Sequence, residues 1–348
     1  MRNFRDHLIL KGQTIKEALV KLDVLALDAI LFVVDEADHL VGSLTDGDVR
    51  RGLLKDISID NLVDEIIQVG PRFIRKGERD IEKVIAYREA NFRILPVLDR
   101  DNRVVNVINF RIMRSYLPVD AVIMAGGRGQ RLKPLTDSTP KPLLKVGDKA
   151  IMEHNVDRLA LYGIDDFWFS VKYLGYQIEQ FFGAGIEKNI QIQYVWEDEA
   201  LGTIGAVSKI TEFQHDYILI TNSDILTNMD YEHFFLEFIK NNADLAIVTI
   251  PYEVNIPYAV LETMEGKVTD FKEKPTYTYY SNGGIYLIKK SCLKYIPTSE
   301  FYNATDLMEK LIKKGYNVMS YPLIGYWLDV GQHEDFERAQ RDIKQIKF

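Results

Sequence analysis

The chain has 348 residues, of which 27% are charged and 47% hydrophobic, and its formal net charge is −8. This length predicts two domains, each with its own core, and the acidic balance argues against nucleic acid or an anionic membrane as a partner. The single cysteine, Cys292, excludes an internal disulfide, and no long apolar run is present near the start. Together these features predict a cytoplasmic protein without a membrane span.

Residues 1–117 are predicted to form a separate α/β module with two related halves. Ala29 to Thr45 reads as a hairpin, and Arg93 to Asn109 repeats its layout when the two polar turns are aligned. Each hairpin is expected to follow one helix and precede another, the preceding helices being Ile15–Leu22 and Ile81–Ala90. A repeated unit that is too small to bury its own apolar face predicts that the two halves pack together.

This paired layout resembles a tandem of cystathionine-β-synthase-type (CBS) repeats, a Bateman module. In that family a Thr or Ser, with an Asp one helical turn later, holds the phosphate and ribose of an adenosine nucleotide. The first half has this pair as Thr45 and Asp48, whereas the second half has Asn109 and Ile112. The resemblance therefore implies at most one regulatory nucleotide, and self-association through the repeats. The alternative is a spacer or dimerisation module without a ligand, because this pattern is also ordinary helix-cap chemistry.

Residues 118–348 are predicted to form a Rossmann-like α/β domain with a mixed, mostly parallel sheet. Val119 to Met124 is an apolar run typical of a buried parallel strand, interrupted only by Asp120. Helix-like and strand-like segments then alternate. The helices are expected at Ile151–Leu161, Gln177–Phe182 and His333–Ile343, and the strands at Asp166–Val171, Ile192–Val195, Asp216–Thr221 and Ile285–Ile288.

A glycine-rich loop follows the first of these strands. After Ala125 come Gly126, Gly127 and Gly129, which let the backbone approach a ligand closely and turn its N–H groups outward. The loop is not a P-loop, because the last glycine is not followed by Lys and Ser or Thr. A dinucleotide fingerprint would need a small residue where Leu132 stands. The loop nevertheless predicts a polyphosphate site.

Two basic residues accompany the glycines. Arg131 carries a fork of donors that matches phosphate oxygens, and Lys141 stands between two prolines on a stiffened loop. The stretch AGGRGQRLKPLT followed by PKPLLKV resembles the sugar-1-phosphate nucleotidylyltransferases. The resemblance implies transfer of a nucleotidyl group from a nucleoside triphosphate to a sugar 1-phosphate, with Arg131 and Lys141 as catalytic residues. It also implies nucleotide binding by Ala125, Gly126, Gly127, Gly129, Gly202 and Thr203.

Two aspartates are the candidate metal ligands. Asp224 follows an apolar strand, at the sheet edge where open α/β sheets bind ligands. Mg²⁺ prefers one or two carboxylates together with waters and substrate phosphates. By resemblance to the family, Asp224 and Asp329 hold this Mg²⁺. Taken alone, an Asp after a strand is more often a turn or cap residue.

The sugar phosphate is assigned by resemblance to a later stretch. The family implies that Glu273 and Lys274 contact the sugar 1-phosphate, and that Asn282 and Gly283 line the sugar pocket. The alternative is a charged surface loop followed by a core strand. Tyrosines 277, 279 and 280 are expected to form a loop cover.

The base and the sugar do not follow from these residues. An N-terminal tandem-repeat module fused to such a domain resembles guanylyltransferases of bacterial nonulosonate pathways. That resemblance implies GTP and glucosamine 1-phosphate as substrates, on the route to legionaminic acid. Mannose-1-phosphate guanylyltransferase and glucose-1-phosphate thymidylyltransferase are the competing assignments, and a nucleotide-sensing regulator without turnover is the alternative of another class.

Overall fold

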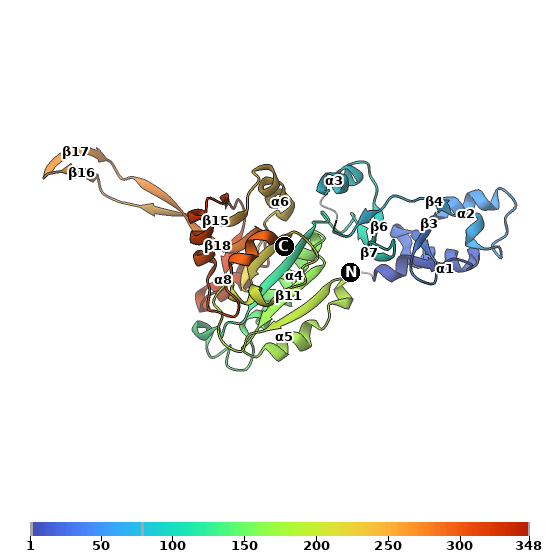
Figure 1. The fold of residues 1–348 in the computed structure, drawn as a ribbon, viewed down its shortest axis with the longest axis horizontal. Coiled ribbons are helices and arrows are strands. Elements are labelled where there is room, and N and C mark those ends of the chain that lie inside the picture. Colours follow the sequence, from blue (N-terminus) through green and yellow to red (C-terminus); the bar gives the residue numbers. More distant parts are fainter. Residues whose placement is uncertain (1–2, 78–79, 347–348) are drawn as a thin grey trace.

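The computed structural model describes residues 3–77 and 80–346. The strands of its main sheet are β8 (Val119–Ala125), β11 (Asp166–Val171), β12 (Gln191–Trp196), β13 (Tyr217–Asn222), β15 (Leu245–Asn255), β18 (Thr276–Lys289) and β19 (Val318–Pro322). Their order is β12-β11-β8-β13-β18-β15-β19. β18 runs antiparallel to both neighbours, and the other pairs in this sheet are parallel. The predicted mixed, mostly parallel sheet is therefore confirmed (Figure 1).

Apolar cores cover both faces of this sheet. One face packs against α4 (Ile151–Leu161), α5 (Gly175–Phe182) and α6 (Tyr231–Lys240), and the other against α7 (Ala304–Lys313) and two 3₁₀ helices, Gly205–Lys209 and Lys290–Tyr295. Along β8, Ala121 and Ile123 face the first core and Val122 faces the second, and all three are fully buried. Burial on both faces explains why β8 reads as an almost continuous apolar run.

A smaller layer completes the part of the chain that contains the main sheet, called the catalytic part below for the function expected of it. It contains α8 (His333–Asp342) packed on the ladder of β14 (Ile225–Thr227) with β20 (Trp327–Asp329), and the short pair β9 (Lys145–Val146) and β10 (Lys149–Ala150). From β15 and β18 a long hairpin projects outward, and β16 (Val260–Met264) and β17 (Lys267–Lys272) form its outer part (Figure 1). No helix in the described ranges is long and apolar enough to cross a membrane.

The N-terminal module contains two small sheets. The first half consists of β1 (Leu8–Leu10), α1 (Ile15–Leu25), β2 (Ile30–Val34), β3 (Leu40–Thr45), α2 (Asp46–Leu53) and β4 (Gln68–Val69). The second half consists of β5 (Ile74–Arg75), α3 (Ile81–Glu89), β6 (Ile94–Leu98) and β7 (Val104–Asn109). The expected helix after the second hairpin is absent from the described residues 110–118. Instead this segment bonds to the end of α4, because the chain must enter β8 directly.

The two hairpins have matching turns. Asp35 accepts hydrogen bonds from the backbone two and four residues later, and Asp99 does the same in the second half. The turns also pair with each other: Leu40 N donates to Asn102 O at 3.1 Å, and Val104 N donates to Asp38 O at 2.9 Å. The expected packing between the halves is present, since β2 and β6 share one apolar cluster.

The second half of the module shares its core with the catalytic part. Ile81 and Val84 of α3, together with β6 residues, belong to the same apolar cluster as α4 and α6. Arg88 of α3 also forms a double hydrogen bond to Glu232 of α6, with both N–O distances 2.9 Å. The first half of the module, in contrast, has its own apolar cluster around α1 and β2.

A buried charge cluster reinforces this junction. Lys76, next to β5, lies 3.0 Å from Asp166 and 3.8 Å from Asp165, both at the start of β11. Asp120 at the start of β8 accepts a hydrogen bond from the backbone N of His215 at 2.7 Å. Although burial lowers the pKa of Lys76, the carboxylates of Asp165 and Asp166 outweigh it and raise that pKa overall. The lysine therefore neutralises acidic groups that the sheet alone would leave buried and uncompensated.

Replacing Lys76 with Met is expected to destabilise the protein by about 3 kcal/mol, because removal of one partner leaves buried carboxylates without their cation. Urea unfolding should show the loss. Lys16→Met on the exposed side of α1 is the matched control and should change stability little. Equal stability of the two variants would mean that the cluster does not hold the junction together.

Asp166 should make stability depend on pH. Burial, and next the charge of Asp165, raise the pKa of Asp166 to about 6. The folded pKa lies above the ordinary value, so the stability from this group is full below pH 3.8 and is lost as the pH rises through about 6. We expect the unfolding free energy of the wild type, relative to Asp166→Asn, to fall across this window. If urea titrations gave the same difference in unfolding free energy between the two proteins at every pH, this prediction would be contradicted.

Candidate active site

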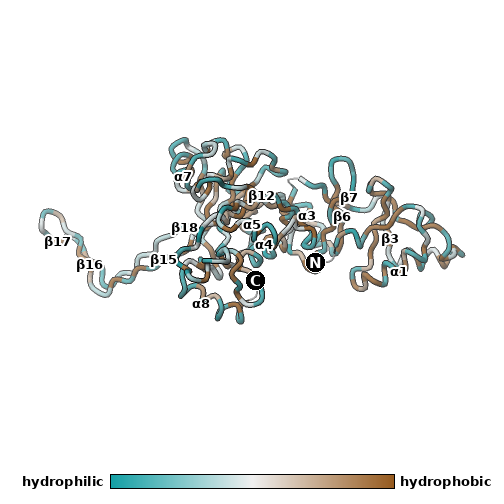
Figure 2. Tube along the Cα trace, turned by 90° about the horizontal axis from the view of Figure 1, so that it is seen from below, coloured by the Kyte–Doolittle hydropathy of each residue, from teal (hydrophilic) through white to brown (hydrophobic). Residues whose placement is uncertain are grey.

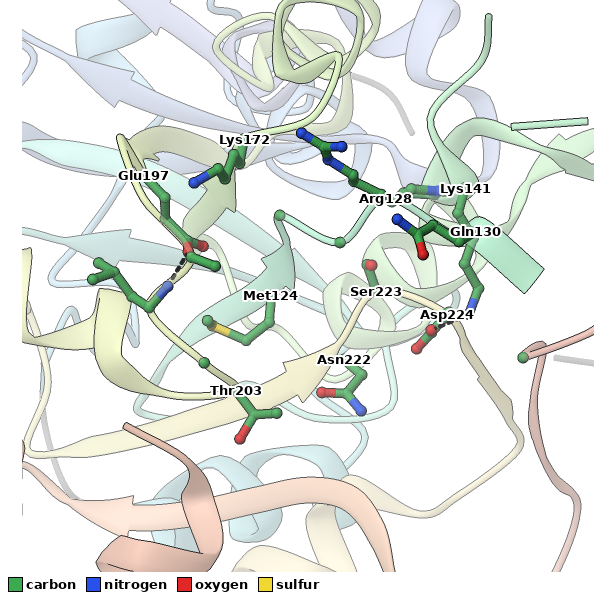
Figure 3. A pocket seen from close by; sticks show the side chains of 18 of the residues that line it. Met124, Arg128, Gln130, Lys141, Lys172, Glu197, Thr203, Asn222, Ser223 and Asp224 are labelled. Atoms are coloured by element: carbon green, nitrogen blue, oxygen red, sulfur yellow. Dashed lines mark hydrogen bonds and ion pairs between the residues drawn. The ribbon is translucent and has the colours of Figure 1, made fainter. Parts of the chain in front are cut away.

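The carboxyl ends of the parallel strands meet at one edge of the sheet, and a cavity of about 570 Å³ opens there. Segments that follow four different strands line it. Figure 3 shows Arg128 after β8, Lys172 after β11, Glu197 after β12 and Asp224 after β13 directed toward this space. Since these strands are parallel, groups far apart in the chain converge at this edge.

The glycine-rich loop requires its glycines for steric reasons. Gly129 has a φ of 59°, and a side chain there would meet Lys141 and Thr136 at 3.0 Å. A side chain on Gly126 would lie 2.8 Å from the carboxylate of Glu197. Gly126, Gly127 and Gly129, which are predicted to bind the nucleotide, all line the cavity. Ala125 does not, because it is buried at the end of β8.

The Leu-Gly-Thr segment is held to the cavity wall by two contacts. Glu197 accepts a hydrogen bond from Ser170 Oγ at 2.5 Å and another from Leu201 N at 3.1 Å. Thr203 Oγ1 accepts from the backbone N of Ala304 at 2.9 Å, at the start of α7. Gly202 and Thr203, which are predicted to bind the nucleotide, therefore line the cavity and also pack against the start of α7.

Gly202→Ala is expected to raise the KM for the triphosphate about tenfold. Gly202 has a φ of 77°, and an added side chain would lie 2.6 Å from the carbonyl oxygen of Tyr302, so the segment must shift. Gly183→Ala is the matched control, because its φ is also positive but nothing lies within 4 Å of the added atom. Similar KM values for both variants would show that the segment does not contact the nucleotide.

A small antiparallel ladder brings the two predicted metal ligands together. In it, Ile225 of β14 pairs with Asp329 of β20, and Val330 N donates to Asp224 O at 3.0 Å. Lys141 forms an ion pair with Asp224 and lies 3.9 Å from Asp329 Oδ1. Burial, and next the neighbouring Asp224 carboxylate, raise the pKa of Asp329. The site thus concentrates two carboxylates and one ammonium group at the cavity floor.

The donor set fits a hard divalent cation. Asp224 Oδ1 and Asp329 Oδ1 are both buried and have no hydrogen-bond partner among the described residues. Two carboxylates whose Oδ1 atoms have no hydrogen-bond partner, with Asp224 lining the larger cavity and Asp329 lining the smaller one beside it, match the preference of Mg²⁺. The buried group Asp120, Asp166 and His215 does not serve this cavity. It lies at the opposite ends of the parallel strands, where Lys76 already supplies the positive charge.

A second cavity of about 260 Å³ adjoins the first and shares Thr203 and Asn222 with it. Asn282 and Gly283, which the family resemblance assigns to the sugar pocket, line it. Asn282 Nδ2 donates to Tyr286 Oη at 2.7 Å, and Trp327 Nε1 donates to Gly283 O at 2.9 Å. Its described lining includes no lysine or arginine.

Glu273 and Lys274 are not brought to either cavity in the described structure. Both are exposed on the projecting hairpin, next to the end of β17. Tyr277, Tyr279 and Tyr280 belong to β18 on this hairpin, so the expected loop cover is a strand. Only the second half of β18, buried from Gly283 to Ile288, contains the core strand that the sequence indicated.

Several lining residues were not singled out from the sequence. They are Met124, Lys172, Asn222, Phe301 and Trp327. Lys172 and Asn222 could have been found, because each is a polar residue at the end of an apolar strand. Phe301 and Trp327 had no such signal, since an aromatic residue in a loop or short strand is usually a packing residue.

In the N-terminal module, Thr45 and Asp48 bond to each other at the start of α2. Asp48 accepts hydrogen bonds from Thr45 N and Oγ1, and from Arg51 and Gln68 Nε2. The Asp48 carboxylate is therefore already engaged in a capping box, whereas the family resemblance assigns it to an adenosine nucleotide. A cavity of about 570 Å³ between the halves is lined by other residues, including His39 and Phe73.

A doubly covered α/β sheet with a glycine loop, a basic residue and paired carboxylates at its carboxyl edge defines a nucleotide-binding protein suited to phosphate chemistry. Residues 120–346 match the model of the nucleotidyl transferase family. The chain therefore belongs to the nucleotidyl transferase family.

Several relatives are named for transfer of a nucleotidyl group to a sugar 1-phosphate. A UTP–glucose-1-phosphate uridylyltransferase of Synechocystis is 30% identical over 249 residues, covering 65% of this chain and 64% of the relative. A D-glycero-alpha-D-manno-heptose 1-phosphate guanylyltransferase of Aneurinibacillus thermoaerophilus is 31% identical, covering 65% and 99%. A structure assigned as a glucose-1-phosphate thymidylyltransferase of Bacillus anthracis superposes with a TM-score of 0.53 at 25% identity, covering 66% and 97%. The match thus spans less than two thirds of the Synechocystis relative.

Proposed function

We propose that this protein transfers a nucleotidyl group from a nucleoside triphosphate to a sugar 1-phosphate. An oxygen of the sugar phosphate attacks the α-phosphorus, the bond from that phosphorus to the bridging oxygen breaks, and pyrophosphate leaves. The observation that carries the proposal is the convergence of Lys141, Asp224 and Asp329 at the junction of two adjoining cavities. The larger cavity suits the triphosphate and the smaller one suits the sugar.

The residues of the site act mainly by positioning and by charge. Arg131 lines the larger cavity beside Gly331, and no ion pair engages its guanidinium within the described part of the chain, so the guanidinium can hold the departing phosphates. Lys141 lies where the α-phosphate and the sugar phosphate must meet. No general base is required, because the attacking phosphate is already ionised at neutral pH. A Mg²⁺ held by Asp224 and Asp329 would neutralise charge on the phosphates.

For the substrates we propose GTP and glucosamine 1-phosphate. The support is the resemblance of the N-terminal repeats, fused to this domain, to nonulosonate guanylyltransferases. The names of the relatives include uridylyl, guanylyl and thymidylyl transfer, so they support the reaction class and leave the base open. The test crosses each nucleoside triphosphate with hexose and hexosamine 1-phosphates and measures pyrophosphate release. A preference for UTP or dTTP would redirect the assignment, and the lack of any turnover would favour a nucleotide-sensing regulator.

The adenosine site at Thr45 and Asp48 stays a prediction, and the capping box supports its structural alternative. Calorimetric titration of the whole protein with AMP, ADP and ATP tests it, alongside Asp48→Ala. If AMP, ADP and ATP bind to Asp48→Ala as they bind to the wild type, the bound nucleotide does not use this carboxylate and the site at Thr45 and Asp48 is refuted.

A further inference from the structure

Three ionisable side chains meet at the amino ends of the parallel strands, away from the active site. Asp120 stands at the start of β8, Asp166 at the start of β11, and His215 just before β13. These strands are neighbours in the order β11-β8-β13, and Asp120 and Asp166 are directly opposite each other in the β8–β11 pair. All three residues are buried, although Figure 2 shows hydrophobic stretches through the sheet around them. We call these three residues the amino-edge cluster.

The polar atoms of the amino-edge cluster are spaced for a metal ion. His215 Nδ1 lies 3.4 Å from Asp120 Oδ2 and 3.9 Å from Asp166 Oδ2, and the three ligand atoms all lie within 4.8 Å of one another. Ligand atoms about 2.1 Å from a tetrahedral Zn²⁺ stand about 3.4 Å apart. One imidazole nitrogen with two carboxylate oxygens is a donor set that zinc accepts. Small side-chain shifts would therefore close the three atoms around one ion.

His215 directs a ring nitrogen into the cluster without using it elsewhere. Its side chain is 2% exposed, and its Nδ1 atom makes no hydrogen bond within the described residues, the 3.4 Å contact with Asp120 included. Burying such an atom costs free energy unless a partner satisfies it. The backbone N of His215 donates to Asp120 Oδ2 at 2.7 Å, and Gln214 N donates to Asp120 Oδ1 at 3.2 Å. These bonds fix the Asp120 carboxylate, as the outer contacts of metal ligands do.

The charges around the cluster favour a further cation. Among the described residues, the buried carboxylates of Asp120, Asp165 and Asp166 share one ammonium group, that of Lys76. With a neutral imidazole at His215, this lysine leaves two negative charges in excess, and a divalent ion would cancel them. The Nζ atom of Lys76 lies 3.0 Å from both oxygens of Asp166, so it keeps a partner in Oδ1 when another cation takes Oδ2.

We propose that the amino-edge cluster binds one Zn²⁺, with His215, Asp120 and Asp166 as its protein ligands. A cavity of about 530 Å³, lined among others by Lys76 and Asp165, adjoins the cluster and gives the ion and a water ligand a path from solvent. The nitrogen donor separates this site from the all-oxygen Mg²⁺ site at the opposite ends of the strands.

The bound ion would hold three neighbouring strands together beside the junction with the N-terminal module. Because the unfolded chain lacks this arrangement, zinc should stabilise the folded protein. The pH dependence expected from Asp166 then belongs to the metal-free protein, since a metal-bound carboxylate has no proton to lose.

Zinc binding is measured by calorimetry, and by metal analysis after dialysis, in a parent protein that carries Asp224→Asn and Asp329→Asn. These changes remove the competing carboxylates of the active site. The parent should bind one Zn²⁺ per chain and melt several degrees higher with zinc. Adding His215→Gln should weaken zinc binding at least about 100-fold, because loss of a direct ligand costs no less than loss of an outer contact. Adding His233→Gln instead, at an exposed position on α6, is the matched control and should change nothing.

Asp166→Asn in the same parent keeps the test independent of folding. The amide lowers the excess of buried negative charge and Lys76 keeps Asp165, so the metal-free variant should melt no lower than the parent while its zinc affinity falls. The proposal is overturned if the parent binds no zinc at micromolar concentrations, since protons would then neutralise the cluster. Unchanged zinc affinity in His215→Gln or in Asp166→Asn overturns it too, as does an equal loss in the His233→Gln control.

Discussion

Asp329→Asn is expected to lower kcat at least about 100-fold, equal to about 2.7 kcal/mol, while the folded protein becomes no less stable. The two effects separate because the carboxylate is unfavourable for folding. Burial and the adjacent Asp224 raise its pKa, and its Oδ1 atom has no hydrogen-bond partner in the described structure. A neutral amide of the same shape removes repulsion between the two acids but loses a ligand for the metal.

The measurements are pyrophosphate release at saturating substrates, Mg²⁺ titration, and thermal unfolding in the presence of a chelator. Asp224→Asn should lose activity to a similar extent, because both carboxylates face the same point. Asp148→Asn, in the exposed turn between β9 and β10, is the matched control. Near-normal turnover at limiting Mg²⁺ in both site variants would remove the metal assignment. A loss of stability in Asp329→Asn would instead assign that residue a structural role.

Arg131→Lys is expected to reduce kcat/KM for the triphosphate about 100-fold, although the positive charge is kept. A guanidinium can donate two parallel hydrogen bonds to phosphate oxygens, and an ammonium on a flexible stem cannot. Arg131 is exposed in the larger cavity, and a side chain added at Gly331 would lie 3.4 Å from its Nη2 atom. The planar guanidinium of Arg131 therefore lies beside Gly331, close to the candidate metal ligand Asp329.

The control for Arg131→Lys is Arg341→Lys, an exposed position on α8. Inhibition by pyrophosphate gives a second readout, since a residue that holds the departing phosphates should also bind this product. We expect weaker pyrophosphate inhibition in Arg131→Lys and no change in the control. Unchanged inhibition and turnover would mean that Arg131 only packs against Gly331.

Local features were predictable from the sequence. The strand β8 and the helix α4 lie where the apolar pattern placed them, and α4 has the predicted bounds. The glycine loop was predictable from its run of glycines after a strand. In the structure Gly129 adopts a positive φ, and Gly126 approaches Glu197 too closely for a side chain. The sequence patterns behind these predictions are local, although some of the contacts that make the glycines necessary join distant residues. The predicted role of Asp224 came from its place after a strand as well as from the family resemblance, whereas the predicted roles of Asp329 and the Asn282 stretch came only from that resemblance.

The tertiary structure alone decided which distant groups meet. Asp224 and Asp329 come together because β14 pairs with β20, and Lys76 reaches Asp166 because the second half of the module shares a core with the catalytic sheet. Lys274 lies on an extended arm instead of in the sugar cavity. Strand register and packing between separated segments determine these outcomes, and neither is encoded in the local pattern of apolar, polar and glycine residues.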